Sequence, residues 1–362
     1  MKRNSVRRLT FCAMAMVSLC GVSVAKSPSY AVQQLHPDLT ELAGTALNDK
    51  SKVAAIIKNK KGQYHGAVCS AAACTKVQTL PGAPEGSFTS IYSIDRRGHA
   101  VGASPTDQTW SHAILFDGAQ TIDLGAFDED GCGGCSSYSF AYDMNDKGQV
   151  VGSSLTGDGK VRAFVWKDGV MTKLPTLGGS NSEAMAINER GVAVGLADLD
   201  DVQHIAHAVL YRKGRAQDLG VLDGDLDSRA DDINNFDVVV GQSYRHGPDG
   251  SVSTPFVYSD GVLKRLPLPA EGIDGRAGNV NDAGWIVGSY VKNGESLRRG
   301  WVFDGQDAYD LNKLIPAADQ ARWIIGGASG INEAGQIVVT ANKPSDSRST
   351  YTLILTPTVS LD

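Results

Sequence analysis

Residues 184–195 read Ala-Met-Ala-Ile-Asn-Glu-Arg-Gly-Val-Ala-Val-Gly, and variants of this phrase return along the chain. Each copy has an apolar residue followed by Asn or Asp, then a turn, then a β-branched run that generally closes in Val-Gly. The steps between closing residues are 47, 50, 43, 46, 47 and 51. A strand-like unit with such a period indicates an array in which each unit buries its apolar faces against its neighbours. The copies begin at Leu47-Asn48, Ile94-Asp95, Met144-Asn145, Ile187-Asn188, Ile233-Asn234, Val280-Asn281 and Ile331-Asn332, and close near Ala55, Gly102, Gly152, Gly195, Gly241, Gly288 and Val339.

Each repeat divides into four pieces of strand length. In the copy quoted above these pieces are residues 182–188, 192–197, 206–212 and 215–219. The third and fourth pieces are joined by a dipeptide that ends in Gly, and such dipeptides tolerate the positive φ angles of a tight two-residue hairpin. We therefore expect antiparallel strands and almost no helix. The dipeptides are Asp117-Gly118, Asp168-Gly169, Lys213-Gly214, Asp260-Gly261 and Asp304-Gly305.

The two ends of the chain distinguish a closed ring from an open β-solenoid. The last repeat supplies three strands, at residues 329–332, 336–341 and 350–355, and stops before a fourth. Residues 30–35 form an orphan strand that resembles that missing fourth one. Ring closure would remove the exposed sheet edges, whereas a solenoid would gain nothing from dividing a repeat. The sequence therefore predicts an all-β, seven-bladed β-propeller of four-stranded antiparallel blades, closed by the N-terminal strand.

The first 25 residues are typical of a secretory signal peptide. They combine a basic start, an apolar stretch over residues 9–24 and small residues before Lys26. We expect residues 1–25 to be removed and residues 26–362 to form one exported propeller domain, periplasmic or secreted, without an integral membrane segment. Loss of the four basic residues of the leader takes the formal charge from −6 to −10. An acidic surface repels phosphate, which argues against a nucleic-acid partner.

The repeats resemble the HAF-type family of probable extracellular repeats. That family's pattern has an Ala-x-x-Ile-Asn strand, a Gly-x-Val-Val-Gly strand, a His-Ala-Phe-x-Trp strand and an Asp-Leu-Gly strand. Residues 184–195, 207–211 and 218–220 match most closely, together with residues 163–166. The resemblance implies export and a propeller-like array, and it assigns no active-site residue. The chain departs from the pattern at Arg162, Pro255, Arg299-Gly300 and Asp237.

Residues that recur at equivalent positions of several repeats are interpreted as structural. His65, His112 and His207 each begin a third strand, and equivalent positions in different blades cannot converge on one metal ion. The recurring Asn suits the turn that follows each first strand.

Four cysteines remain in the mature chain. In an oxidising compartment they favour disulfides, and we expect pairs Cys69 with Cys74 and Cys132 with Cys135. A redox role for Cys132 and Cys135 is disfavoured, because residues 128–130 beside them are acidic and cannot stabilise a thiolate.

Asp223, Asp225 and Asp227 stand at alternate positions in a linker between two repeats. Calcium loops use such spacing, although Ser228 and Asn234 replace the Gly and Glu of the helix-loop-helix form. The sequence therefore leaves two interpretations: a weak calcium site or a solvated acidic loop.

If the fourth strand is outermost, the linkers between blades and the loops between second and third strands open on one face. These loops differ most among the repeats, and exposed aromatic and charged residues on them are suited to recognition. Our main hypothesis is a monomeric, non-catalytic propeller that binds a protein or glycan partner through this face. The alternatives are a secreted or periplasmic hydrolase or lyase that uses Asp225, Asp227, His246 or other carboxylates, with or without calcium, and a structural matrix component. The candidate partner-binding residues are Trp110, Asp130, Asp200, Asp201, Tyr244, Arg245, His246, Tyr290 and Arg298.

Overall fold

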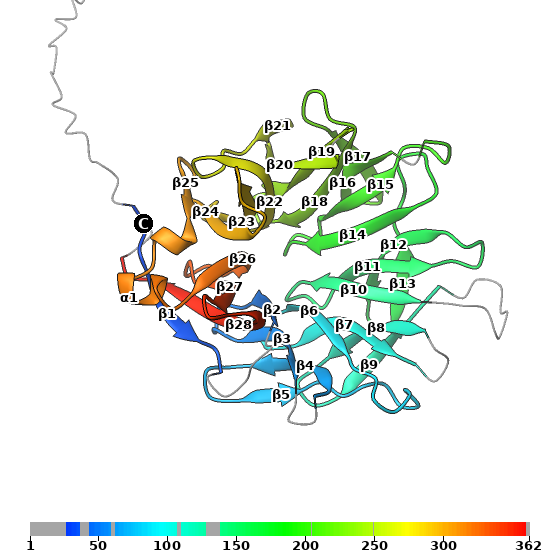
Figure 1. The fold of residues 1–362 in the computed structure, drawn as a ribbon. Helices are drawn as coiled ribbons and strands as arrows, with labels where there is room; N and C mark the ends of the chain where they lie inside the picture. Colours follow the sequence, from blue (N-terminus) through cyan, green and yellow to red (C-terminus); the bar gives the residue numbers. More distant parts are fainter. Residues whose placement is uncertain are drawn as a thin grey trace, which may run out of the picture.

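The computed structural model describes residues 27–36, 43–58, 62–106, 110–127, 138–203, 205–248 and 250–359. These residues form seven four-stranded antiparallel sheets arranged as blades around one axis (Figure 1). Blade 1 contains β2 (Ala43–Leu47), β3 (Val53–Lys58), β4 (Tyr64–Cys69) and β5 (Cys74–Lys76). Blade 2 contains β6 (Ser90–Ile94), β7 (Ala100–Pro105), β8 (Ser111–Phe116) and β9 (Thr121–Gly125). Blade 3 contains β10 (Ser139–Met144), β11 (Val150–Leu155), β12 (Val161–Lys167) and β13 (Val170–Lys173).

The remaining blades follow the same plan. Blade 4 contains β14 (Ser182–Ile187), β15 (Ala193–Asp198), β16 (Ala206–Arg212) and β17 (Arg215–Gly220). Blade 5 contains β18 (Asp227–Ile233), β19 (Val239–Gly247), β20 (Gly250–Ser259) and β21 (Val262–Arg265). Blade 6 contains β22 (Gly272–Val280), β23 (Ile286–Lys292), β24 (Arg298–Phe303) and β25 (Ala308–Asp310). Blade 7 contains β26 (Ile324–Ile331), β27 (Ile337–Lys343), β28 (Asp346–Pro357) and the N-terminal β1 (Tyr30–Gln34).

The ring closes as the sequence predicts. Strand β1 pairs antiparallel with β28, with Tyr30 opposite Pro357 and Gln34 opposite Leu353. Helical structure among the described residues is limited to the 3-10 turn η1 (Leu311–Lys313) and the single-turn helix α1 (Ala317–Gln320), both in the linker from blade 6 to blade 7. The seven-bladed all-β prediction is therefore confirmed.

The hairpins between third and fourth strands divide into two kinds. In blades 3, 4 and 5 the expected two-residue connection is present: Asp168 has φ 50° and Gly169 has φ 88°, for example. In blades 2 and 6 the connection has four residues, 117–120 and 304–307, and its first Asp accepts hydrogen bonds from the two backbone N–H groups that close the loop. The expectation of a two-residue turn was wrong for these two blades, because a side-chain cap there replaces the positive φ of the first residue.

The glycine that closes each Val-Gly run is required by close packing. The inner strand bulges where it faces this glycine, as at Ala184–Ala186 opposite Gly195. A Cβ on Gly195 would lie 2.0 Å from the carbonyl oxygen of Glu183, and one on Gly152 would lie 1.8 Å from that of Phe140. Neither distance is physically attainable, so the repeated Gly follows from the bulge of the innermost strand.

Apolar side chains pack between successive blades. Val194 and Leu210 of blade 4 share a core with Ala230 and Phe256 of blade 5, and similar clusters join other neighbouring pairs. Because both faces of each sheet are covered in this way, the innermost strands are left with one open side, toward the axis.

Candidate functional site

The antiparallel order of strands defines two ends of the propeller. At one end, which we call the linker end, lie the linkers between blades and the loops between second and third strands. At the other, the Asn-turn end, lie the turns that contain the recurring Asn.

The recurring Asn residues join neighbouring blades into a ring that we call the Asn girdle. In blade 4, Asn188 Oδ1 accepts hydrogen bonds from the backbone N–H groups of Arg190 and Val192, which holds the turn, while Nδ2 donates to the carbonyl of Asn234 in the next blade. Asp95 interrupts the girdle, because a carboxylate cannot donate. The pairs run from Asn48 to Asp95, Asn145 to Asn188, Asn188 to Asn234, Asn234 to Asn281, Asn281 to Asn332 and Asn332 to Asn48, at 2.8–3.2 Å.

A second set of hydrogen bonds between blades is made by the residues that directly follow the Asn of the turns. The backbone N–H of Asp146 donates to the Glu189 carboxylate of the following blade at 2.7 Å, and that of Glu333 donates to Asp49 at 3.0 Å. Arg96 bridges Asp49 and Asp146, at 3.2 Å from each. The polar groups of the Asn-turn end therefore serve contacts between blades, which assigns this end a structural role and extends the turn interpretation of the Asn residues.

The repeated histidines also have structural partners. His112 Nδ1 lies 3.0 Å from the Asp123 carboxylate, and His207 Nδ1 lies 2.9 Å from that of Asp218, each between the third and fourth strands of a blade. Blade 6 places Arg299 and Asp310 in the same relation at 3.1 Å. In blade 1 Lys76 stands opposite His65, and burial together with this cation lowers the pKa of the imidazole.

At the linker end of the inner strands, the axis-facing side chains differ from blade to blade. Counted back from the Asn or Asp of each turn, the fourth residue is apolar or Gly and faces a neighbouring blade, as at Ala141 and Ala230, which are fully buried. The residues on either side of it are half-buried or exposed. Because the inner strand is open only toward the axis, these flanking side chains line the axis.

The inner strands of blades 2 and 3 present aromatic rings toward the axis, and two further rings continue this set at the linker end. We call this set the aromatic column; it comprises Trp110, Tyr138, Phe140, Tyr142 and Tyr92. Consecutive ring centroids are 5.6–6.3 Å apart, and Trp110 with Tyr138 and Phe140 with Tyr142 are stacked. Trp110, at the outer end of the column, is 42% exposed. The column thus runs from the linker end along the inner wall of two blades.

Blades 5 and 6 present ionic groups instead. We call this set the ionic cluster; it comprises Arg229, Asp231, Gln242, Tyr244 and Arg276. Asp231 Oδ1 lies 2.6 Å from Arg229 Nη2, and its Oδ2 accepts from Gln242 Nε2 at 2.6 Å. Buried atoms of two members, Arg229 Nε and Gln242 Oε1, have no hydrogen-bond partner within the part of the chain that the structure describes. In the ring, blades 5 and 6 stand across the axis from blades 2 and 3 (Figure 1).

Burial and mutual charge perturb the pKa values of this wall. Burial raises the pKa of Asp231 to about 6, although Arg229 opposes the shift. Burial also works against the charge of Arg229, but the negative charge of Asp231 and its hydrogen bond to the guanidinium outweigh it and raise the pKa of Arg229. Across the axis, burial and then the charge of Glu183 raise the pKa of Tyr142. The cluster can therefore both donate and accept hydrogen bonds at neutral pH.

Three of the predicted partner-binding residues border this site. Trp110 ends the aromatic column, Tyr244 belongs to the ionic cluster, and Arg298 pairs with Asp274 at 2.5 Å beside it. Tyr290 does not meet the expectation of an exposed aromatic. It is 2% exposed, because it turns into a cavity of about 240 Å³ at the side of blade 6, which Arg299 also lines.

The acidic linker meets an arginine and a histidine from the β19–β20 hairpin. Arg245 Nε lies 3.2 Å from Asp225 Oδ1, and Arg245 also donates to the carbonyl of Asp223. His246 Nε2 lies 2.5 Å from Asp227 Oδ2. Within the described ranges, no three His, Cys, Asp or Glu side chains converge on a point where a metal ion could bind. The calcium hypothesis thus gains no support from this geometry and stays a prediction.

The other predicted residues lie apart from the axis or beyond the described ranges. Asp201 accepts from the backbone N–H and the hydroxyl of Ser180, and Asp200 caps its own loop through the N–H groups of residues 202 and 203. Asp130, Cys132, Cys135 and the proposed leader, residues 1–25, lie outside the described residues. Cys69 and Cys74 form the predicted disulfide, which spans the first blade's outer hairpin.

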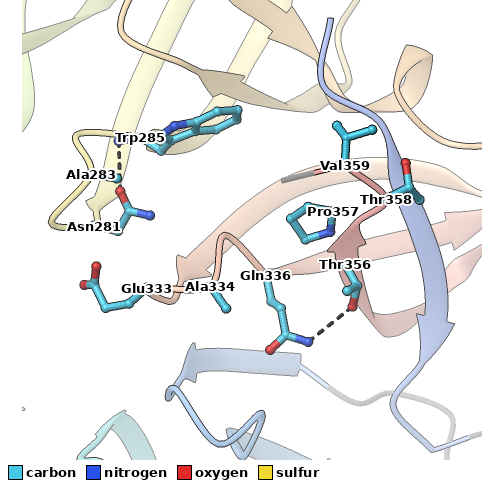
Figure 2. Close-up of a pocket in the computed structure, with 10 residues that line it drawn as sticks. All are labelled: Asn281, Ala283, Trp285, Glu333, Ala334, Gln336, Thr356, Pro357, Thr358 and Val359. Atoms are coloured by element: carbon cyan, nitrogen blue, oxygen red, sulfur yellow. Dashed lines mark hydrogen bonds between the residues drawn. The ribbon is translucent and has the colours of Figure 1, made fainter. Parts of the chain in front are cut away.

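A pocket of about 650 Å³ lies at the Asn-turn end, between blades 6 and 7 (Figure 2). Trp285 and Pro357 form apolar parts of its wall, and Asn281 and Gln336 form polar parts. The side chain of Asn281 is engaged by the backbone of Trp285 and of residue 332, and Gln336 Nε2 donates to Thr356. Its polar lining is thus already used for contacts within the protein, unlike the axis-facing wall.

Most members of the axis site were missed in the sequence. Tyr92, Phe140, Tyr142, Glu183, Arg229, Asp231 and Arg276 belong to first strands, which were interpreted only as framework. The sequence signal that could have found them is variation in residue type. The positions on either side of the fourth residue before each Asn vary freely, although the first strands are otherwise alike.

No helix among the described residues is both long and apolar enough to cross a membrane. Residues 181–356, somewhat under half of the chain, match a family model described as "Protein of unknown function (DUF3466)". No curated protein matches the chain. Among solved structures, the chain is similar to the β-propeller domain of the Trilobed protease from Pyrococcus furiosus, described as having an open velcro topology, with 10% identity and a TM-score of 0.53 over 90% of this chain and 96% of that one.

Weaker likenesses extend to two other proteins. TolB from Acinetobacter baumannii is 13% identical, with a TM-score of 0.42 over 92% of this chain and 80% of that one. The fucose-specific lectin from Aleuria aurantia is 8% identical, with a TM-score of 0.36 over 78% of this chain and 96% of that one. Both TM-scores lie below 0.5, and the likeness that supports the β-propeller fold is the one to the Pyrococcus furiosus domain, which concerns the fold alone.

Proposed function

We propose that this protein is an exported, non-catalytic, monomeric β-propeller of HAF-type repeats, formed by residues 26–362, that binds a glycan at the linker end of its axis. The observation behind the proposal is the pairing of an aromatic column on one wall with hydrogen-bonding groups on the opposite wall. A sugar ring has an apolar C–H face, which stacks on aromatic rings, and an edge of hydroxyl groups that donate and accept. Trp110 and Phe140 are suited to the C–H face of the sugar. Arg229, Asp231 and Gln242 are suited to its hydroxyl groups.

The unpartnered atoms of the ionic cluster strengthen this proposal. A buried polar atom without a partner costs free energy, and ligand hydroxyl groups are suitable partners for Arg229 Nε, a donor, and Gln242 Oε1, an acceptor, which have none among the described residues. Arg245, His246, Asp200 and Asp201 lie on neighbouring loops of the same end, where a longer glycan or a glycan-bearing partner would reach them. The Cys69–Cys74 disulfide is compatible with export, since disulfides persist in oxidising compartments.

The test is a binding survey with a matched pair of variants. Mature, oxidised protein is titrated against a panel of neutral and acidic oligosaccharides, with Trp110→Ala and Phe236→Ala in parallel. Phe236 is the control because its side chain is 70% exposed at the Asn-turn end. We expect Trp110→Ala to weaken binding about 3- to 30-fold, the loss of one exposed stacking contact, and Phe236→Ala to have no effect. Binding that only Phe236→Ala weakens, or no binding across the panel, would contradict the proposal.

One observation favours a catalytic alternative. The raised pKa of Asp231 would allow a protonated carboxyl near neutral pH, as a general acid in a hydrolase or lyase requires. The same panel answers this alternative: oligosaccharides that bind are incubated with the protein and examined for new reducing or unsaturated ends. Product that forms with the unaltered chain and is lost in Asp231→Asn would replace the binding role with a catalytic one.

A further inference from the structure

The two arginines of the ionic cluster occupy equivalent positions in neighbouring inner strands. Arg229 lies in β18 and Arg276 in β22, each five residues before the Asn of its turn. Arg229 forms an ion pair with Asp231 through Nη2. The Arg276 side chain, which is exposed, makes no hydrogen bond or ion pair with another described residue. It is nonetheless close enough to Asp231 and Tyr244 for its charge to lower the pKa of both groups, against the larger effect of burial.

Most other arginines of the linker end have an ionic partner among the described residues, Arg162 at the start of β12 being an exception. Arg245 pairs with Asp225, Arg298 with Asp274, and Arg299 with Glu295 and Asp310. The acidic groups nearest to Arg276 are already engaged, since Asp231 is held by Arg229 and Gln242, and Asp274 by Arg298 and Ser253. A guanidinium with its donors free on an inner wall is a suitable partner for a planar carboxylate, which it can bind in a bidentate manner.

We propose that the glycan held at the axis is acidic, a uronic-acid oligosaccharide whose carboxylate binds Arg276, with Arg229 beside it, and whose ring stacks on Phe140 and Tyr142. This inference rests on the proposed function and specifies its ligand class. A uronic acid carries its carboxylate on the edge of the ring, so one sugar unit presents an apolar face and an anion at the same time. The site presents the two complementary surfaces on opposite walls. Sulfated sugars share the anionic chemistry and are distinguished by the test below.

The experiment compares ligands that differ only in charge. A galacturonate hexamer, its carboxyl-reduced neutral counterpart and a sulfated galactan hexamer are titrated calorimetrically into the mature, oxidised protein. We expect the galacturonate hexamer to bind at least tenfold more tightly than the other two. Its advantage should shrink at 0.5 M salt, because a half-exposed ion pair is screened.

Two variants assign the charge preference to a residue. Arg276→Gln should weaken binding of the galacturonate hexamer about 10- to 100-fold and change binding of the carboxyl-reduced hexamer less than threefold. Arg265→Gln, on the exposed outer strand of blade 5, removes the same charge away from the axis and should change neither. Unfolding curves of both variants confirm that the fold is kept.

The failures of the two proposals are separable. Equal affinity for the galacturonate hexamer and its carboxyl-reduced counterpart, or an Arg276→Gln variant that binds both as the unaltered chain does, overturns the acidic ligand and leaves a glycan-binding propeller. Tighter binding of the sulfated hexamer also overturns the uronate assignment. Absence of binding to every oligosaccharide, neutral or acidic, overturns the proposed function itself and with it this inference.

Discussion

Asn188 and Asn234 lie in different blades and make the same three hydrogen bonds, whereas Phe140 and Arg276 occupy equivalent positions and share no chemistry. The first pair belongs to the Asn-turn end of the inner strands and the second to the linker end. The ring needs the contacts of the Asn girdle at every junction, so the sequence repeats them. The linker end is held together by the strands around it, which leaves its axis-facing side chains free to differ and to serve a ligand.

The largest expected effect is at the Asn-turn end. Asn234→Ala removes two half-buried hydrogen bonds within the turn and one buried hydrogen bond to the next blade. Because the backbone groups left behind lose their partners, we expect the free energy of unfolding to fall by about 2 to 4 kcal/mol. Chemical denaturation measures this loss, and glycan affinity at a temperature where the variant is folded should be unchanged. A loss of affinity without a loss of stability would contradict the assignment of the Asn-turn end to stability and of the linker end to binding.

The next effect is at the linker end and concerns binding. Phe140→Ala removes the middle ring of the aromatic column, and we expect the affinity for a bound oligosaccharide to fall by about 1 to 3 kcal/mol, or roughly 5- to 150-fold. Calorimetric titration measures the affinity. Met171→Ala, a half-buried residue of the outer strand β13 in the same blade, is the control for a general effect of truncating a side chain of blade 3. Equal losses in both variants would show that the column has no special part in binding.

A third prediction concerns Asp143, which lies between the two ends. Its carboxylate accepts from the Ser93 hydroxyl at 2.6 Å and from the backbone N–H of Ile187 at 2.8 Å, and burial raises its pKa to about 7. The folded protein therefore binds the proton more tightly than the unfolded chain, so this group's contribution to stability falls as pH rises from about 4 to about 7.

Asp143→Asn should remove that dependence. Asn279 already occupies the equivalent position in blade 6. We expect the variant to be more stable than the unaltered protein at pH 8 by about 1 to 2 kcal/mol, and no more stable at pH 4. Denaturation curves across this range measure both. A variant that is destabilised at pH 8 would show that the charged form of Asp143 is the one the fold requires.

The smallest effect is expected where the girdle is interrupted. Asp95→Asn would supply the missing donor toward blade 3 while losing the ion pair with Arg97, whose side chain is 52% exposed. A net hydrogen bond contributes about 0.5 to 1.5 kcal/mol and an exposed ion pair about 0 to 1, so we expect a change in unfolding free energy within about 1 kcal/mol of zero. A loss above 2 kcal/mol would mean that Asp95 is specifically required at this junction.

The sequence predicts the fold closely because each blade repeats the same local rules. The turn that follows Asn188 and the last blade shared by the two ends of the chain are readable from the spacing, whereas the bulge that demands Gly195 was found in the structure. The interblade donation by Asn188 Nδ2 could not be read, because it joins residues 46 positions apart whose proximity exists only in the closed ring.

The site was only half predicted for the same reason. Trp110, Tyr244 and Arg298 lie in or beside the variable connections between second and third strands and were found, whereas Phe140 and Arg276 lie on first strands and were assigned to the framework. Their position in a bulged inner strand, open only toward the axis, follows from the ring and not from local spacing. Tyr290 was wrongly expected on the surface. The direction of a side chain near the end of a strand depends on the neighbouring linker, and here the linker that contains η1 covers it.

The most direct test of the contrast between the two ends is hydrogen–deuterium exchange with and without the galacturonate hexamer at saturating concentration. We predict slower exchange in peptides that cover the linker ends of β10, β18 and β22, and no change in the Asn turns of the same blades. Protection at the Asn turns or around the pocket at Trp285, or no protection anywhere, would contradict the account.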